Sequence, residues 1–310
     1  MSWLRRHVWV LLAICVALAG GLALGAGPLQ GVEDDTAAVV ESGDDKASKA
    51  PADDPFRESV LMAASQLLVG ARLQGVFVTL VVLPEVDDKI VDGVTTVIEQ
   101  AGGALAATVR VDGDFTDPGS KTYVDSVAIS SAKGVRDVSG IPSDDTYGLI
   151  SGLLARAYVT DGNSSTPAFD EVATKIDSEL QGAKLVTVDG DQPRRGSLVV
   201  VLTFGDHGKD DLSGAANLIE MKLITALADA ADGILVATTP GASSPGGLLA
   251  ELADAELPNR NVSSLNVIDS AAGQVASVYA LLATATGQAG DFGVIDGSVV
   301  LPPGLSVPGQ

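Results

Sequence analysis

Residues 76–111 read VFVTLVVLPEVDDKIVDGVTTVIEQAGGALAATVRV, and they indicate the class of fold. The first eight residues are apolar or β-branched without alternation, which predicts a strand covered on both faces. From residue 87 apolar side chains return at helical spacing, until Gly102 and Gly103 predict the end of a helix. Residues 105–111 form a second apolar run. Strand, helix and strand in this order predict a βαβ unit with a right-handed crossover.

The same alternation of strands and helices continues along the chain. Strands are predicted at 184–188, 198–203, 233–238 and 262–267, and helices at 122–132, 144–158, 166–180, 215–231, 247–253 and 271–286. Ser143 is the expected N-cap of the second of these helices, and Asp269 or Ser270 that of the last. Pro167 suits the first turn of the third. The pattern predicts a three-layer α/β body with a mostly parallel sheet.

The body is expected to span 55–295. It opens with a short helix, for which Asp54 is a suitable N-cap and Pro55 a suitable first residue. A division into halves at 55–160 and 161–295 is an alternative. From Asp291 the chain is rich in Gly and Pro, so we expect it to be loose, with 296–310 as a flexible tail.

An apolar run without charged side chains occupies residues 8–27 near the N-terminus. A helix of this length spans about 30 Å, the thickness of the hydrocarbon core of a bilayer. The run is therefore expected to be a single membrane anchor in contact with lipid, and its apolar side chains include Val8, Leu12, Val16 and Leu22. Arg5 and Arg6 precede it, which predicts that the N-terminus lies inside and the body outside.

A cleaved signal peptide is the alternative interpretation of residues 1–27. The run is longer than the usual core of about 7–15 residues in a signal peptide, which favours an uncleaved anchor. The body is exported in either case. Residues 28–54 are acidic, lack aromatic side chains and are predicted to be a disordered linker.

Composition limits the classes of function. The formal net charge is −21, from 40 acidic and 19 basic residues, and such a surface disfavours nucleic acid, whose binding requires cations against phosphates. The single cysteine, Cys15, lies in the apolar run, so no disulfide within the chain stabilises the body.

Two loops carry candidate ligand chemistry. Asp206, His207 and Asp210 follow a predicted strand and could hold a divalent metal, although a solvated loop accounts for them equally well. Residues 241–247, GASSPGG, lie between a strand and a helix, where anions bind in α/β folds, but the lysine of a phosphate-binding loop is missing and a plain turn is favoured. His207 has no nucleophile paired with it, and we expect no enzyme activity.

Several segments together resemble a known family. They are LALGAG at 22–27, VTLVVLPEVDD at 78–88, IEQAGGALAATVRV at 98–111, LVTVDGD at 185–191, SLVVVLTFG at 197–205, GGLLAEL at 246–252 and NVSSLNVIDSAAGQVASVYALLATATGQAGDFGV at 261–294. The chain is similar to the actinobacterial copper transporter family named for mycobacterial copper transport protein B.

The resemblance implies an envelope protein of copper efflux or homeostasis, part of a channel, with a copper ion as the transported species and the outer membrane as its location. It implies partners among envelope proteins or further copies of the chain. No cofactor is assigned with certainty. The alternative is a membrane-tethered extracytoplasmic scaffold or binding domain without transport activity of its own.

Overall fold

The computed structural model describes residues 55–135, 145–161, 169–190, 194–205, 211–255 and 261–305. The apolar run at 8–27 and the acidic linker at 28–54 lie outside these ranges, so the predictions made for them stay predictions.

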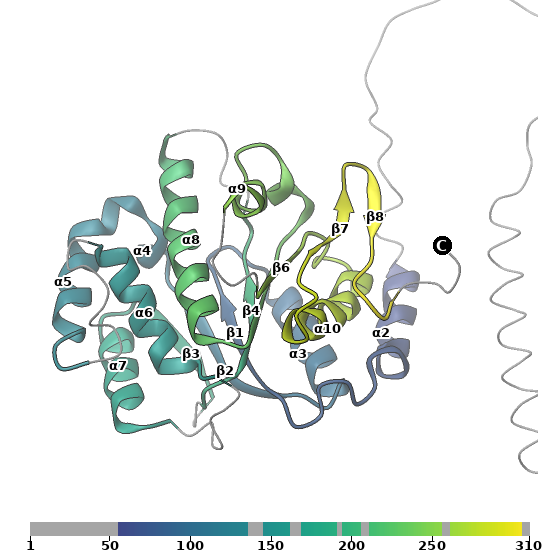
Figure 1. Ribbon diagram of the computed structural model, residues 1–310, viewed down its shortest axis with the longest axis horizontal. Helices are drawn as coiled ribbons and strands as arrows, with labels where there is room; N and C mark the ends of the chain where they lie inside the picture. Colours follow the sequence, from purple (N-terminus) through teal and green to yellow (C-terminus); the bar gives the residue numbers. More distant parts are fainter. Residues whose placement is uncertain are drawn as a thin grey trace, which may run out of the picture. The chain divides into compact units, whose positions relative to one another are not determined.

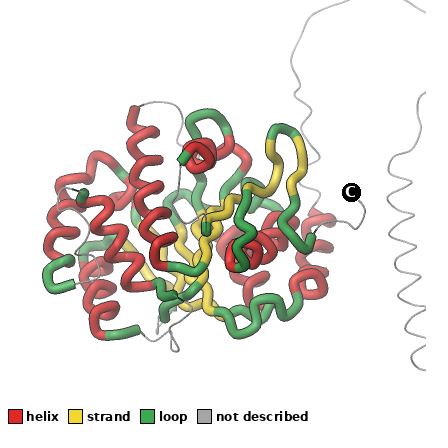
Figure 2. The backbone as a smooth tube through the Cα atoms, in the orientation of Figure 1, coloured by secondary structure: helices red, strands yellow, loops and turns green. Residues whose placement is uncertain are grey.

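One mixed sheet organises the described residues (Figures 1 and 2). Its strands, in spatial order, are β3 (Val186–Asp189), β2 (Ala104–Val111), β1 (Phe77–Val82), β4 (Leu198–Leu202), β5 (Gly233–Ala237), β6 (Val262–Leu265), β7 (Asp291–Ile295) and β8 (Ser298–Val300). The strands from β2 to β7 are parallel to one another, and the edge strands β3 and β8 run antiparallel to their neighbours. The predicted α/β class is confirmed.

Helices cover both faces of the sheet (Figure 1). One face packs against α2 (Pro55–Val69), α3 (Asp88–Gln100) and α10 (Ala271–Ala285). The other packs against α5 (Lys121–Ser131), α6 (Thr146–Tyr158), α7 (Glu171–Gly182), α8 (Asp211–Ala230) and α9 (Leu248–Asp254). Short turns at α4 (Gly113–Thr116), η1 (Pro118–Ser120) and η2 (Pro240–Ser243) join these elements.

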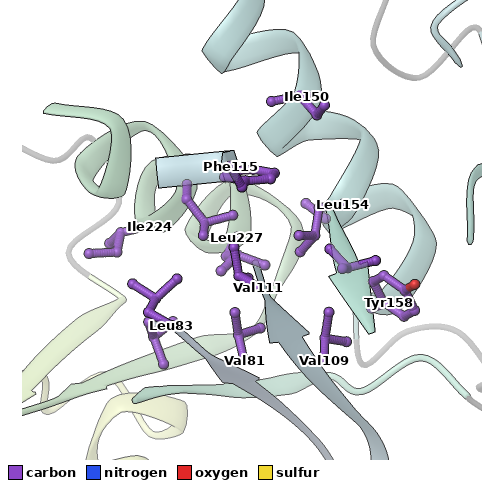
Figure 3. Packing of buried hydrophobic residues seen from close by; sticks show 14 of the residues in the cluster. Val81, Leu83, Val109, Val111, Phe115, Ile150, Leu154, Tyr158, Ile224 and Leu227 are labelled. Carbon is purple, nitrogen blue, oxygen red and sulfur yellow. The ribbon is translucent and has the colours of Figure 1, made fainter. Parts of the chain in front are cut away.

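The continuous apolar character of β1 and β4 follows from this layering, because both faces of these strands meet a hydrophobic layer. Val81 faces the core under α6 and α8, whereas Leu80 and Val82 face α3 and α10. Figure 3 shows Val81 and Val109 pointing from the sheet toward the side chains of α6 and α8. The predicted three-layer arrangement is present.

Two helices begin at aspartates, and neither start coincides with the predicted one. Asp145, and not Ser143, is the N-cap of α6, and its side chain accepts from the backbone N–H of Gly148. Asp170 caps α7 and has extended dihedral angles, so this helix begins after it and not at residue 166. The Asp170 carboxylate accepts from the backbone N–H of Ala173, which stabilises this start, and Pro167 lies outside the described residues. Of the two predicted caps of α10, Asp269 and Ser270, Ser270 is the N-cap.

The prediction of a loose segment from Asp291 was wrong for the strands β7 and β8, which form a hairpin. Asp296 and Gly297 at its tip both have positive φ, 50° and 75°, as a two-residue turn between twisted strands requires. The Asp-Gly pair between apolar residues was the available signal, and the Gly and Pro content around it obscured that signal. Strands from both proposed halves, 55–160 and 161–295, belong to the one sheet, since β1 pairs with β4.

Candidate functional site

A crevice lies beyond the carboxyl ends of two adjacent parallel strands, β1 and β4, whose following helices pack on opposite faces of the sheet. The chain leaves β1 for α3 on one face of the sheet, and it leaves the neighbouring strand β4 for α8 on the other face. Loops that separate in this way leave a gap beyond the carboxyl ends of the strands, which is where open α/β sheets bind ligands. Such a switch point makes this edge the candidate site.

The crevice encloses a cavity of about 170 Å³. Its walls are mainly apolar and comprise Val86, Ile90, Leu202, Phe204, Ala237 and Ile268. Four polar residues complete the lining, namely Glu85, Asp87, Thr203 and Thr239. An apolar cavity with a few convergent polar groups has the character of a small-molecule site.

The loop after β1 presents two carboxylates to this crevice. Asp87 is the N-cap of α3, and its Oδ1 accepts from the backbone N–H of Lys89 at 2.8 Å. Its backbone carbonyl accepts from Ile90 N–H at 2.9 Å. Glu85 has a φ of 69°, in the left-handed region that costs a non-glycine residue about 1–2 kcal/mol. Backbone strain of this kind is often found at ligand sites.

A buried polar group supports the loop after β4. The Thr203 hydroxyl donates to Glu220 Oε2 at 3.0 Å, and both residues are almost fully buried. One turn earlier on α8, Asn217 donates to the carbonyl of Gly246 at 2.9 Å and to Glu251 Oε1 at 3.2 Å. These bonds tie α8 to the end of β4 and to α9, so they hold the floor of the crevice in place.

The metal site predicted from the sequence, at Asp206, His207 and Asp210, lies outside the described residues. Within the ranges that the structure describes, no group of three or more His, Cys, Asp and Glu side chains is placed to hold a metal ion. No helix in these ranges is long and apolar enough to cross a membrane. The assigned anchor residues Val8, Leu12, Val16 and Leu22, and the topology residues Arg5 and Arg6, are outside them as well.

Several backbone N–H groups in and directly after the loop at 241–247 are engaged within the fold. Gly247 N–H donates to the Ser244 carbonyl at 2.8 Å, and Leu248 N–H donates to the Gly205 carbonyl at 3.1 Å. The helix that follows, α9, has only seven residues. The arrangement is that of an ordinary turn before a short helix.

A buried asparagine joins the last strands to the sheet. Asn266 Nδ2 donates to the Val294 carbonyl and to Ser243 Oγ, both at 2.8 Å. Its Oδ1 accepts from the N–H of Val294, also at 2.8 Å. A Cβ at Gly293 would come within 2.0 Å of that Oδ1, so only glycine fits beside this clamp. Asn266 falls within the strand predicted at 262–267, and its sequence context predicts no role for it.

Ion pairs hold the helices on the face opposite α3. Burial raises the pKa of Asp145, but hydrogen bonds from Lys222 Nζ and from the Gly148 backbone outweigh it, so this pKa lies below its ordinary value. Burial likewise raises the pKa of Asp170, but hydrogen bonds from Arg156 and from the helix backbone have the larger effect. The pKa of Asp170 therefore also lies below its ordinary value. These carboxylates are therefore charged at neutral pH.

The crevice itself was not found from the sequence. Its two walls, around Val86 and Phe204, are separated by more than a hundred positions in the chain. The available signal was the polar residue that directly follows each apolar run, Glu85 after Pro84 and Thr203 after Leu202. Residues at the carboxyl ends of parallel strands share one edge of a sheet, but only the strand order shows which of them are neighbours.

Comparison with known proteins gives one consistent result. A family model described as copper transport outer membrane protein, MctB, matches residues 1–303. Proteins named copper transporter MctB from Mycobacterium bovis and Mycobacterium tuberculosis are each 26% identical over 300 residues, which cover 91% of this chain and 92% of theirs. Because the family model spans nearly the whole chain, this protein belongs to the MctB family of copper transport outer membrane proteins.

Proposed function

We propose that the protein acts in the cell envelope in copper efflux and homeostasis. The observation that carries this proposal is the match to a copper transport family over residues 1–303, which includes the N-terminal run as well as the folded body. Relatives that bear the name copper transporter align over 91% of the chain. In this proposal copper is the transported substrate, and the proposal does not depend on a copper ion bound permanently to the protein.

The phenotype of a deletion strain tests the proposal directly. Loss of the gene should raise sensitivity to copper and raise cell copper content, and expression of the intact chain should restore both. Challenge with zinc is the matched control and should leave the two strains alike. Equal growth and equal copper content with and without the protein would contradict a role in copper efflux.

The proposed topology is a single-pass anchor with the N-terminus inside. Arg5 and Arg6 before the apolar run support it, because basic residues stay on the cytoplasmic side. Alkaline phosphatase joined after Gly190, an exposed position, should be active, since this enzyme requires export. A cytoplasmic reporter such as β-galactosidase joined at the same residue should be inactive. The reverse pattern would refute the topology.

The route for copper in this proposal is an assembly of N-terminal helices or a partner protein, and the α/β body is not its wall. The central strands β4 and β5 are buried on both faces, and outer helices such as α3 and α7 bury one stripe each, which suits a body whose outer surface faces water. Residues 28–310 added to a planar lipid bilayer should give no current, whereas the intact chain in the same assay should. Reproducible stepwise conductance from residues 28–310 would refute this assignment.

Asp206, His207 and Asp210, which belong to the exported body, remain a proposed copper contact that is separate from that route. Carboxylate and imidazole ligands suit Cu(II). His207→Ala in the intact chain should lower the heat of Cu(II) binding in titration calorimetry, with His7→Ala as the control. Equal heats for the intact chain and His207→Ala would remove this site.

The alternative function is a tethered scaffold or binding domain without transport of its own. It is favoured by the absence, from the described residues, of a metal-ligating group together with the presence of an apolar crevice. A deletion strain with unchanged copper handling but altered envelope complexes would support this alternative. In both cases partners are further copies of the chain or other envelope proteins, with lipid around the N-terminal run.

A further inference from the structure

We propose that the crevice between the loop after β1 and the end of β4, at Thr203 and Phe204, binds a small organic cation, with an apolar body of one ring and a protonated amine. This inference goes beyond copper handling and rests on the size, the hydrogen bonds and the charge of the crevice.

The size of the cavity sets the size of the apolar body. The cavity measures about 170 Å³. An apolar protein cavity of about 150 Å³ accepts benzene, whereas pockets for drug-sized ligands and cofactors measure about 300–1,000 Å³. One ring with a short side chain therefore fits here, and a nucleotide does not.

The walls favour an apolar ligand at depth and an aromatic contact nearer to solvent. Leu202 and Ile268 are almost fully buried, so they form a dry inner end. Phe204 is 37% exposed, so its ring borders both the cavity and water. A cation near the face of such a ring gains about 0.5–2 kcal/mol, depending on how far it is desolvated.

The polar groups of the lining are mainly hydrogen-bond acceptors, so a ligand that donates hydrogen bonds suits the cavity. Thr203 has given its hydroxyl proton to Glu220, so it offers only lone pairs to the cavity. The N–H groups of Lys89 and Ile90, at the start of α3, already donate to Asp87. Two of the amides that could attract an anion to this helix start are thus already engaged.

The charge of the lining selects against anions. Glu85 and Asp87 are exposed carboxylates at the mouth, and neither lysine nor arginine is among the described residues that line the cavity. A carboxylate or phosphate ligand would meet two like charges. An ammonium group would form charge-assisted hydrogen bonds with them, which are about twice as strong as neutral ones.

The test uses the intact chain in nanodiscs and saturation-transfer NMR, with empty nanodiscs as the blank. The probes are 2-phenylethylammonium, 2-phenylethanol and phenylacetate, which share one ring and differ in charge. The ammonium should bind at least about tenfold more tightly than the alcohol, and phenylacetate should give no transfer. Equal affinity of the cation and the alcohol, preferred binding of phenylacetate, or no binding of the ammonium would overturn the proposal.

Two variants locate the site. Glu85→Gln should weaken ammonium binding about three- to tenfold and leave the alcohol unchanged, whereas Glu99→Gln, an exposed carboxylate near the other end of α3, should change neither. Ile90→Trp should fill the cavity and abolish binding of both probes, with circular dichroism to verify the fold. Equal loss in Glu85→Gln and Glu99→Gln, or retained binding in a folded Ile90→Trp variant, would refute the location. The copper phenotype of the deletion strain is independent of every outcome here.

Discussion

Replacing Asn266 with alanine should release the β7–β8 hairpin while the rest of the sheet stays folded. The attachment of this hairpin is short, because β7 pairs with β6 only at two positions, Asp291 opposite Ser264 and Phe292 opposite Leu265. Beyond them the backbone of Val294 is held by the side chain of Asn266, which accepts from its N–H and donates to its carbonyl, both at 2.8 Å. Alanine removes both bonds.

The size of the effect follows from these bonds. Each hydrogen bond contributes about 0.5–1.5 kcal/mol net, so the loss of two lowers the free energy of opening the hairpin by about 2 kcal/mol. A change of about 1.4 kcal/mol is tenfold in an equilibrium constant. The amides of β7 and β8 should therefore exchange about 30-fold faster in the variant, by the opening route that local unfolding provides.

Hydrogen exchange followed by mass spectrometry measures this directly on the peptide that covers 291–300. Asn261→Ala is the matched control, since Asn261 also donates two side-chain bonds, to the carbonyls of Ala228 and Ala231 at the end of α8. Its loss should speed exchange at the end of α8 and leave the hairpin unchanged. If the hairpin exchanged at the same rate in both variants, Asn266 would not be what holds β7.

Three further predictions concern the stability of the body. Gly273→Ala should lower the free energy of unfolding, measured in urea, by more than about 2 kcal/mol. The reason is that the added Cβ would lie 1.7 Å from the backbone carbonyl oxygen of Val267. Unchanged stability would contradict this close approach. Thr203→Val should cost about 1–3 kcal/mol by the same measurement, since it leaves the buried carboxylate of Glu220 without this donor; a stability gain would contradict it. Asp145 has a pKa below its ordinary value, so its ion pair with Lys222 stabilises the fold above the unfolded pKa of about 4 and is lost as pH falls through the folded pKa. Unfolding free energy should therefore fall less steeply below about pH 5 in Asp145→Asn than in the natural protein, and equal slopes would refute the assignment.

The layers of the fold were accessible from the sequence because burial leaves a local record. Residues 76–83 lack alternation, and this is possible only where helices cover both faces, as α3 and α6 do here. The start of α10 was also predictable, because Ser270 is adjacent in sequence to the backbone N–H groups that it caps. Features of this kind depend on neighbours within a few residues.

The remainder depends on contacts between distant positions. Asp170, the cap of α7, is held by a hydrogen bond from Arg156 of another helix. Asn266 holds β7 through the backbone of Val294, which is distant in sequence. The crevice required the order of strands in the sheet, which hydrophobic spacing does not specify. Sequence patterns therefore predicted the elements and layers, and missed the site and the clamp.

The place of β1 between β2 and β4 has a consequence for the time at which the body can form. Val78 pairs with Leu198, about 120 residues later in the chain. At roughly 5–20 residues per second, β1 and β2 wait about 6–24 s during synthesis before the strand that covers their open edge exists. An apolar edge left unpaired for that time invites pairing with other chains. The emerging chain therefore needs protection until β4 is made, and a chain cut before residue 202 should be an aggregation substrate and not a smaller folded protein.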